Sequence, residues 1–248
     1  MNPVLAYLHN FFFNVYPYIC LAVFLMGSLA RFDRDQYTWK SDSSQMLRTG
    51  TLRWGSNLFH IGILFLLFGH TVGLLTPHAA YGWLISAPQK QMFAIISGGT
   101  AGFVCFIGLT ILLHRRIFDP RIRLTSHRTD LAILIILWLQ LTIGLITLPY
   151  SWAHRHEATT MLVLAEYLQG IATFRPNAEM LAGISWPYLL HMLLGMTIFL
   201  LFPFSRLVHV WSGFASIFYL FRPYQVVRGR RLNVPPDQNQ PARGSGAN

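Results

Sequence analysis

Four histidines within or at the ends of two apolar runs are the residues of this 248-residue chain most able to do chemistry. His60 and His70 stand in NLFHIGILFLLFGHTVGLL, and His191 and His209 stand in LLHMLLGMTIFLLFPFSRLVHVW. An ionisable side chain in hydrocarbon is costly, so it marks a candidate functional site. Because imidazole is a standard axial ligand of haem iron, two helices with two histidines each could hold two bis-histidine haems.

The composition predicts that these runs belong to an all-α, polytopic membrane bundle. Hydrophobic residues make up 53% of the chain and charged residues only 11%, about half the charge of an ordinary soluble domain. Five runs are long enough to cross roughly 30 Å of hydrocarbon. The predicted spans are Phe11–Ala30, Asn57–Leu75, Met92–Leu113, Leu131–Leu148 and Tyr188–Trp211.

Two predicted segments lie outside these spans. Residues 1–222 are expected to form one membrane domain, and the polar residues 223–248 a tail that is disordered unless a partner orders it. Between the fourth and fifth spans, apolar residues at helical spacing predict a short interfacial helix; they are Met161, Leu164, Ala165 and Leu168. The two cysteines, Cys20 and Cys105, lie in apolar runs and are expected to be packing residues.

The basic residues predict the orientation of the spans. Sixteen of the nineteen lysines and arginines fall in the first and third loops and after the fifth span, and three fall on the other side. Basic residues gather in cytoplasmic loops, so the N-terminus is expected outside and the C-terminus in the cytoplasm. This pattern also accounts for the net charge of +10 without a nucleic-acid partner, for which the sequence has no motif.

The orientation decides which histidines can meet. The second and fifth spans are antiparallel, so His60 pairs with His209 near the cytoplasmic side and His70 pairs with His191 near the outer side. The spacings do not match, because ten residues are about 15 Å of helix and eighteen are about 27 Å. Pro203 could kink the fifth span and absorb part of the difference.

The four histidines and the glycines near them can also be interpreted without a haem. A single membrane histidine is often a helix–helix hydrogen-bond donor. Gly62, Gly69 and Gly195 lie near the histidines, where small residues would let a flat macrocycle approach a helix or let two helices pack closely.

The roles of three basic residues near the histidine pairs can each be interpreted in two ways. Lys90 is the only basic residue of the second loop, and it either binds a quinone oxygen or snorkels at the interface. Arg53 and Arg206 are either propionate partners or positive-inside anchors.

At these residues the sequence resembles the gamma subunit of bacterial respiratory nitrate reductase, a dihaem cytochrome b membrane anchor. The resemblance runs from about Phe11 to Arg228, and its last stretch is long and specific. The stretches that carry it are FFFNVYPYI (11–19), QYTWKSDSSQML (36–47), SNLFHIGIL (56–64), LLTPH (74–78) and LGMTIFLLFPFSRLVHVWS (194–212).

The resemblance implies a function and a set of site residues. His60 and His209 would hold an inner haem b, and His70 and His191 an outer haem b, in a multi-pass protein of the bacterial inner membrane. Lys90, with Gly69 nearby, would bind a quinol, menaquinol or ubiquinol, oxidised toward the periplasm. Electrons would pass through the haems to an iron–sulfur beta subunit and then to a molybdenum-containing alpha subunit that reduces nitrate.

Three alternatives remain at this point. The chain could be a dihaem anchor of another reductase, a transporter that uses its histidines as a proton relay, or a passive anchor. Haem absorption in the visible range excludes the transporter, and quinol-dependent haem reduction excludes the passive anchor.

Overall fold

A computed structural model describes residues 2–34 and 49–212 of the chain, and all regular structure within these ranges is helical. Five of its helical segments are long and apolar enough to cross a membrane, as predicted. They are Pro3–Arg34, Gly50–Leu75, Ala87–Phe118, Arg128–Ala153 and Trp186–Phe204. The predicted tail, like the stretch 36–47, lies outside the described residues.

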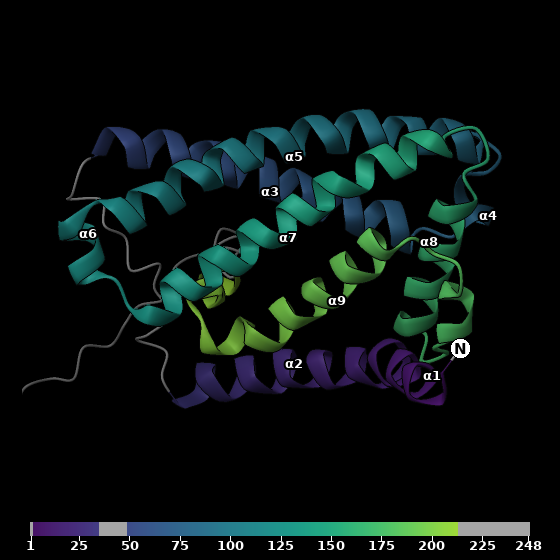
Figure 1. Cartoon of the computed structure of the whole chain (residues 1–248), viewed down its shortest axis with the longest axis horizontal. Helices are drawn as coiled ribbons and strands as arrows, with labels where there is room; N and C mark the ends of the chain where they lie inside the picture. The colour runs from purple at the N-terminus through teal and green to yellow at the C-terminus, as the bar shows by residue number, and fades with distance from the viewer. Residues whose placement is uncertain (1, 35–48, 213–248) are drawn as a thin grey trace, which may run out of the picture. The chain divides into compact units, whose positions relative to one another are not determined.

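The long helices carry most of the bundle, and short ones connect them (Figure 1). The first segment is α1, a π-helical turn (η1) and α2 in succession. The elements are α1 (Pro3–Asn10), η1 (Phe11–Val15), α2 (Tyr16–Arg34), α3 (Thr49–Leu75), α4 (His78–Tyr81), α5 (Ala87–Phe118), α6 (Pro120–Thr125), α7 (Arg128–Ala153), α8 (Thr159–Ala172), η3 (Ala178–Leu181), α9 (Trp186–Leu201), η4 (Phe202–Phe204) and η5 (Arg206–Val208).

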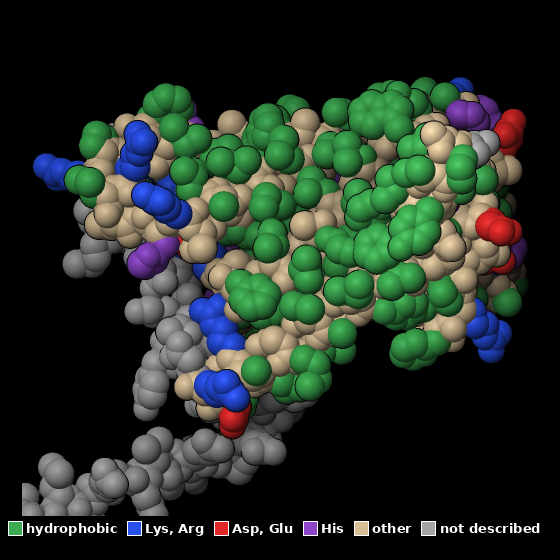
Figure 2. Space-filling model, turned by 60° about the horizontal axis from the view of Figure 1, so that its bottom comes forward, with side chains coloured by type: hydrophobic (Ala, Val, Ile, Leu, Met, Phe, Trp, Pro, Cys, Tyr) green, Lys and Arg blue, Asp and Glu red, His purple; other side chains and the backbone are tan. Residues whose placement is uncertain are grey.

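The long helices alternate in direction, so the described bundle has two ends (Figure 1). One end, called the α8 end, holds the N-terminus, α4 and α8, and the other, called the α6 end, holds α6. Charged side chains gather toward the two ends, while hydrophobic side chains cover most of the face between them (Figure 2). An apolar band between two charged ends is what a membrane span requires.

Glycines set the closest helix contacts. The long helices contact one another in the order α3, α5, α7, α9, α2. A Cβ on Gly62 of α3 would lie 2.8 Å from Cys105 Cα of α5, and a Cβ on Gly108 would meet the backbone of α3. Small residues let helix backbones approach each other in this way. Gly62 therefore serves helix packing, and the predicted alternative, that it faces a macrocycle, is not seen.

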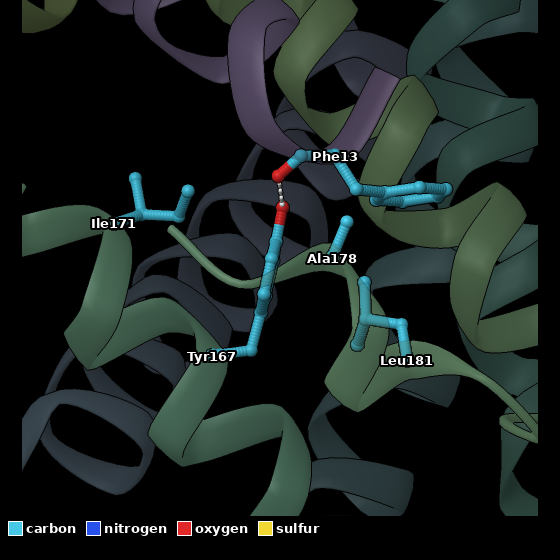
Figure 3. Close-up of a cluster of buried hydrophobic side chains, with 5 residues drawn as sticks. All are labelled: Phe13, Tyr167, Ile171, Ala178 and Leu181. Atoms are coloured by element: carbon cyan, nitrogen blue, oxygen red, sulfur yellow. Dashed lines mark hydrogen bonds between the residues drawn. The ribbon is translucent and has the colours of Figure 1, made fainter. Parts of the chain in front are cut away.

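Helix α8 confirms the predicted short helix, but it packs into the bundle. Pro17 has no N–H to give to the Phe13 carbonyl four residues earlier, and the chain forms the π-helical turn there. Tyr167 of α8 donates its hydroxyl to this Phe13 oxygen at 2.6 Å (Figure 3). The two side chains share a buried cluster with Ile171, Ala178 and Leu181. Burial raises the pKa of the Tyr167 phenol, which is therefore neutral and able to donate.

The fifth span differs from the prediction, which carried one run of helix through Trp211. The regular helix ends at Leu201, and two short 3₁₀ turns follow around an extended Ser205 before helix resumes at His209. Pro203 removes a backbone donor at this point. Arg31 of α2 donates to the freed carbonyls of Pro203 and Ser205, at 2.7 and 3.0 Å. The break is thus built in and stabilised from a neighbouring helix.

The cysteines are packing residues, as expected. Cys20 and Cys105 are both buried free thiols. Cys105 lies where α5 meets α3 and contacts the Phe59 carbonyl at 3.6 Å.

Candidate functional site

The four histidines of the two apolar runs form two cross-helix pairs. The ring centroids of His60 and His209 are 6.3 Å apart, and those of His70 and His191 are 6.2 Å apart. The pairs link α3 to the α9 segment and to the turn after it, at two levels of the bundle. Along α3 the two levels are ten residues, or about 15 Å, apart.

Hydrogen bonds orient every one of these rings in the same way. Each Nδ1 lies 2.6–3.1 Å from a backbone carbonyl oxygen. A carbonyl oxygen only accepts, so Nδ1 carries the proton and Nε2 keeps its lone pair. Ligand histidines in metalloproteins are commonly fixed by such a bond from the other ring nitrogen. The carbonyls belong to Ser56, Leu66, Gln140 and Arg206, for His60, His70, His191 and His209 respectively.

The spacing of the rings fits a metal held between two imidazoles. A first-row metal lies about 2 Å from a histidine nitrogen, so two opposed rings on one iron have centroids about 6 Å apart. In the described part of the chain, no group of three or more His, Cys, Asp and Glu side chains could hold a metal. A pair is the donor set that axial haem ligation needs, because the porphyrin supplies the remaining ligands.

Helix α7 shapes the surroundings of His191. The missing side chain of Gly144 makes room for the ring, because a Cβ there would lie 2.8 Å from His191 Cε1. The Gln140 amide nitrogen lies 3.4 Å from His191 Nε2, and its Oε1 is buried with no partner among the described residues. A metal held by His191 would use the lone pair that this amide faces, so the Gln140 side chain would have to turn away.

Two of the predicted glycines face the site differently. A Cβ on Gly69 would meet nothing within 4 Å, so the backbone beside His70 is open. A Cβ on Gly195 would lie 3.2 Å from the Gln140 amide nitrogen. Gly69 thus borders open space on its side of α3, and Gly195 leaves room for Gln140.

Lys90 stands near the start of α5 at the α8 end. The contacts of Gly55 with Leu112 and of Gly62 with Cys105 set the register of α3 against α5. Continued along the helices, this register places Lys90 opposite the end of α3, about 10 Å of helix rise beyond His70. Its ammonium lies over the ring of Tyr81, 3.7 Å from the centroid.

A buried charge cluster lies at the α6 end. Arg116 of α5 binds Asp130 of α7 at 2.9 Å, with side-chain exposures of 9% and 7%. Arg206 approaches the same carboxylate oxygen at 3.8 Å, and its own carbonyl accepts the Nδ1–H of His209. The structure thus brings Arg206, but not the exposed Arg53, into contact with the residues around a histidine pair.

Four residues of this site escape sequence reasoning: Gly144, Gln140, Asp130 and Tyr81. Each acts through a contact with a distant segment, and an α-helical glycine or tyrosine carries no mark of its partner. For Asp130 the sequence does hold one indication. A carboxylate near the end of an apolar run is costly without a partner, so its position predicts one. Within the described residues, the arrangement as a whole defines a helical membrane protein with two stacked histidine pairs and Lys90 near one end.

Comparison with known proteins places this arrangement in a family. Residues 9–230 match the family model described as "Nitrate reductase gamma subunit". The chain therefore belongs to the nitrate reductase gamma subunit family.

Named relatives cover nearly the whole chain. The respiratory nitrate reductase 2 gamma chain of Escherichia coli is 49% identical, with 92% of this chain and all of the relative covered. The respiratory nitrate reductase 1 gamma chain of the same organism is 46% identical, with 91% and 100% covered. The nitrate reductase gamma chain of Bacillus subtilis is 35% identical, with 88% and 96% covered.

Proposed function

We propose that this chain is the membrane cytochrome b subunit of a respiratory nitrate reductase, which oxidises quinol at its α8 end and delivers the electrons at its α6 end. Two b haems would connect these ends, one held by His70 and His191 and one by His60 and His209. An iron–sulfur beta subunit and a molybdenum-containing alpha subunit would receive the electrons and reduce nitrate. Family membership supports the complex, and the paired rings support the haems.

The observation that carries the proposal is the pair of matched ring separations, 6.2 and 6.3 Å, with all four Nδ1 atoms tied to carbonyls. A haem with both axial positions filled by histidine carries electrons and has no open position for a substrate. The protein residues do the rest: the carbonyls fix the tautomer and tilt of each ring, and Gly144 leaves the space that His191 needs.

Quinol oxidation is assigned to the surroundings of Lys90 and Gly69. The Lys90 ammonium is a donor for a quinol oxygen, and the open backbone at Gly69 admits a flat ring beside His70. Two protons leave a quinol with its two electrons, so a site at the end of the bundle can release them directly to water.

The charge distribution supports the orientation. In the described ranges the α8 end carries Lys90, Arg155 and Arg175, and the α6 end carries nine arginines. We therefore place the α8 end and the N-terminus in the periplasm and the α6 end in the cytoplasm of a bacterial inner membrane. A membrane-impermeant thiol reagent applied to intact spheroplasts is expected to label Arg155→Cys and not Arg123→Cys. The reverse pattern would invert the proposed direction of electron flow.

The decisive experiment is a redox titration of the purified complex, followed by visible absorption. Two b-type centres are expected in the wild type, and one in either His191→Ala or His60→Ala, with the surviving centre differing between the variants. His114→Ala is the matched control, because this histidine contacts Phe118 outside both pairs and should leave two centres. A colourless wild-type complex, or variants that keep both centres, would refute the haem assignment.

A further inference from the structure

Lys90 lies near the N-terminus of α5, a position that is electrostatically unfavourable for a cation. Ser86 and Gln89 form a capping box that fixes where the helix begins, and Lys90 follows one residue later. The N-terminus of a helix carries partial positive charge, so an ammonium in its first turns is destabilised. An acidic side chain would be the usual choice there, yet the first turn of α5 has none. A neighbouring group that attracts the ammonium would offset this cost.

The compensating group is an aromatic ring. The Lys90 Nζ lies 3.7 Å from the centroid of the Tyr81 ring, within the range of a cation–π interaction. No carboxylate of the described residues forms an ion pair with Lys90. Burial raises the pKa of the Tyr81 phenol, so the tyrosine is neutral and meets the ammonium through its ring face.

The Tyr81 ring is itself held by its own short helix. The His78 ring packs edge-on against it, with centroids 5.1 Å apart and an interplanar angle of 70°. Gly82 makes room for that imidazole, because a Cβ there would lie 2.8 Å from His78 Cε1. The four residues of α4 therefore present a fixed aromatic face to the start of α5.

We propose that Tyr81 is the positioning residue of Lys90 in quinol oxidation. A ring face holds an ammonium without neutralising it, whereas a carboxylate would pair with it and occupy its N–H donors. The N–H donors of the ammonium that do not face the ring thus stay available for a quinol oxygen. This inference rests on the proposed function, because it assigns to Tyr81 the placement of the side chain that binds the substrate.

The test compares Tyr81→Phe with Tyr81→Leu in the whole membrane-bound complex. Phenylalanine keeps the ring face and is expected to leave KM for a short-chain quinol within about twofold of wild type. Leucine removes it and is expected to raise KM about threefold to tenfold, with a smaller change in kcat. Both variants should retain the wild-type haem spectrum and normal nitrate reduction with a soluble artificial donor that bypasses the membrane subunit. If Tyr81→Leu does not assemble, Tyr81→Met fills a similar volume without a ring.

Lys90→Ala separates this inference from the proposed function. Wild-type quinol kinetics in Lys90→Ala would refute the quinol site itself. If Lys90→Ala is impaired but Tyr81→Leu is normal, or if Tyr81→Phe is as impaired as Tyr81→Leu, positioning by the ring is wrong. In the double variant Lys90→Ala/Tyr81→Leu, KM should equal that of Lys90→Ala. A further rise would show that Tyr81 acts independently of Lys90, which would also overturn the inference.

Discussion

The two ends of the bundle are held together by different chemistry. At the α8 end, neutral hydrogen bonds tie α8 to its neighbours, from Tyr167 to Phe13 and from Gln169 to the Leu74 carbonyl at 2.8 Å. At the α6 end, a buried ion pair between Arg116 and Asp130 lies beside Arg206. Under the proposed function, neutral bonds suit the surface that a lipid-soluble quinol would approach. The buried ion pair lies beside Arg206, in the segment where α9 has ended.

A contrast between the ends also appears in the two histidines of the fifth span. His191 lies in regular helix and receives its orientation from the Gln140 carbonyl of α7, far away in sequence. His209 follows the broken segment and is oriented by Arg206 three residues earlier. The break also resolves the unequal spacings of ten and eighteen residues, because the stretch between His191 and His209 is not one continuous α-helix.

The largest effect is expected from Gly144→Ala, which should abolish the His70–His191 site alone. The new Cβ would lie 2.8 Å from His191 Cε1 and would push the ring out of line. Optical titration should then show one b-type centre in place of two. Gly99→Ala on α5 is the control, since its Cβ would meet Leu148 at an ordinary 3.4 Å. Two intact centres in Gly144→Ala would show that the ring position is less constrained than the contact implies.

Asp130→Ala tests the charge cluster at the other end. Removing one partner of a buried ion pair costs about 3–5 kcal/mol, because a buried charge is left unpaired. We expect a lower unfolding temperature of the complex and a changed midpoint potential for the His60–His209 centre, with the other centre unchanged. Asp130→Asn keeps a hydrogen-bond acceptor for Arg116 and should lose less. Equal changes in both centres would mean that the cluster stabilises the bundle as a whole.

Tyr167→Phe tests the neutral bond at the α8 end. It leaves the Phe13 carbonyl without its hydroxyl donor, and an unsatisfied buried acceptor costs about 1–3 kcal/mol. The unfolding temperature should fall while both centres keep their potentials, because neither histidine pair contacts this bond. Tyr7→Phe, at an exposed tyrosine of α1, is the matched control and should unfold as the wild type does. A change in potential would instead link α8 to the site.

The smallest effect is expected from Gln169→Leu. Its amide donates to the Leu74 carbonyl at the end of α3, and losing one such bond costs roughly 0.5–1.5 kcal/mol. Faster hydrogen exchange confined to the last turn of α3 is the measurement that detects it. Exchange that also accelerates around His60 would contradict the separation of the two ends.

Much of the architecture could be predicted from the sequence. Apolar runs of sufficient length mark the five spans, because a membrane accepts a chain segment only when its backbone is internally bonded and its side chains are apolar. The alternation of the spans then allows only one level-matched pairing of His60, His70, His191 and His209. In the fifth span, Pro203 signals a weak point in the helix but not how far the irregular segment after it runs.

The sequence by itself thus determined the membrane class, the spans and the histidines that can face one another, because these depend on hydropathy and on order along the chain. Tertiary packing determined which residues serve those histidines. Gly144, Asp130 and Tyr81 act across helices that are distant in sequence, and the contacts that give them a role depend on register and rotation. Hydropathy leaves both undetermined, because an apolar helix can turn about its axis without changing the pattern that inserts it.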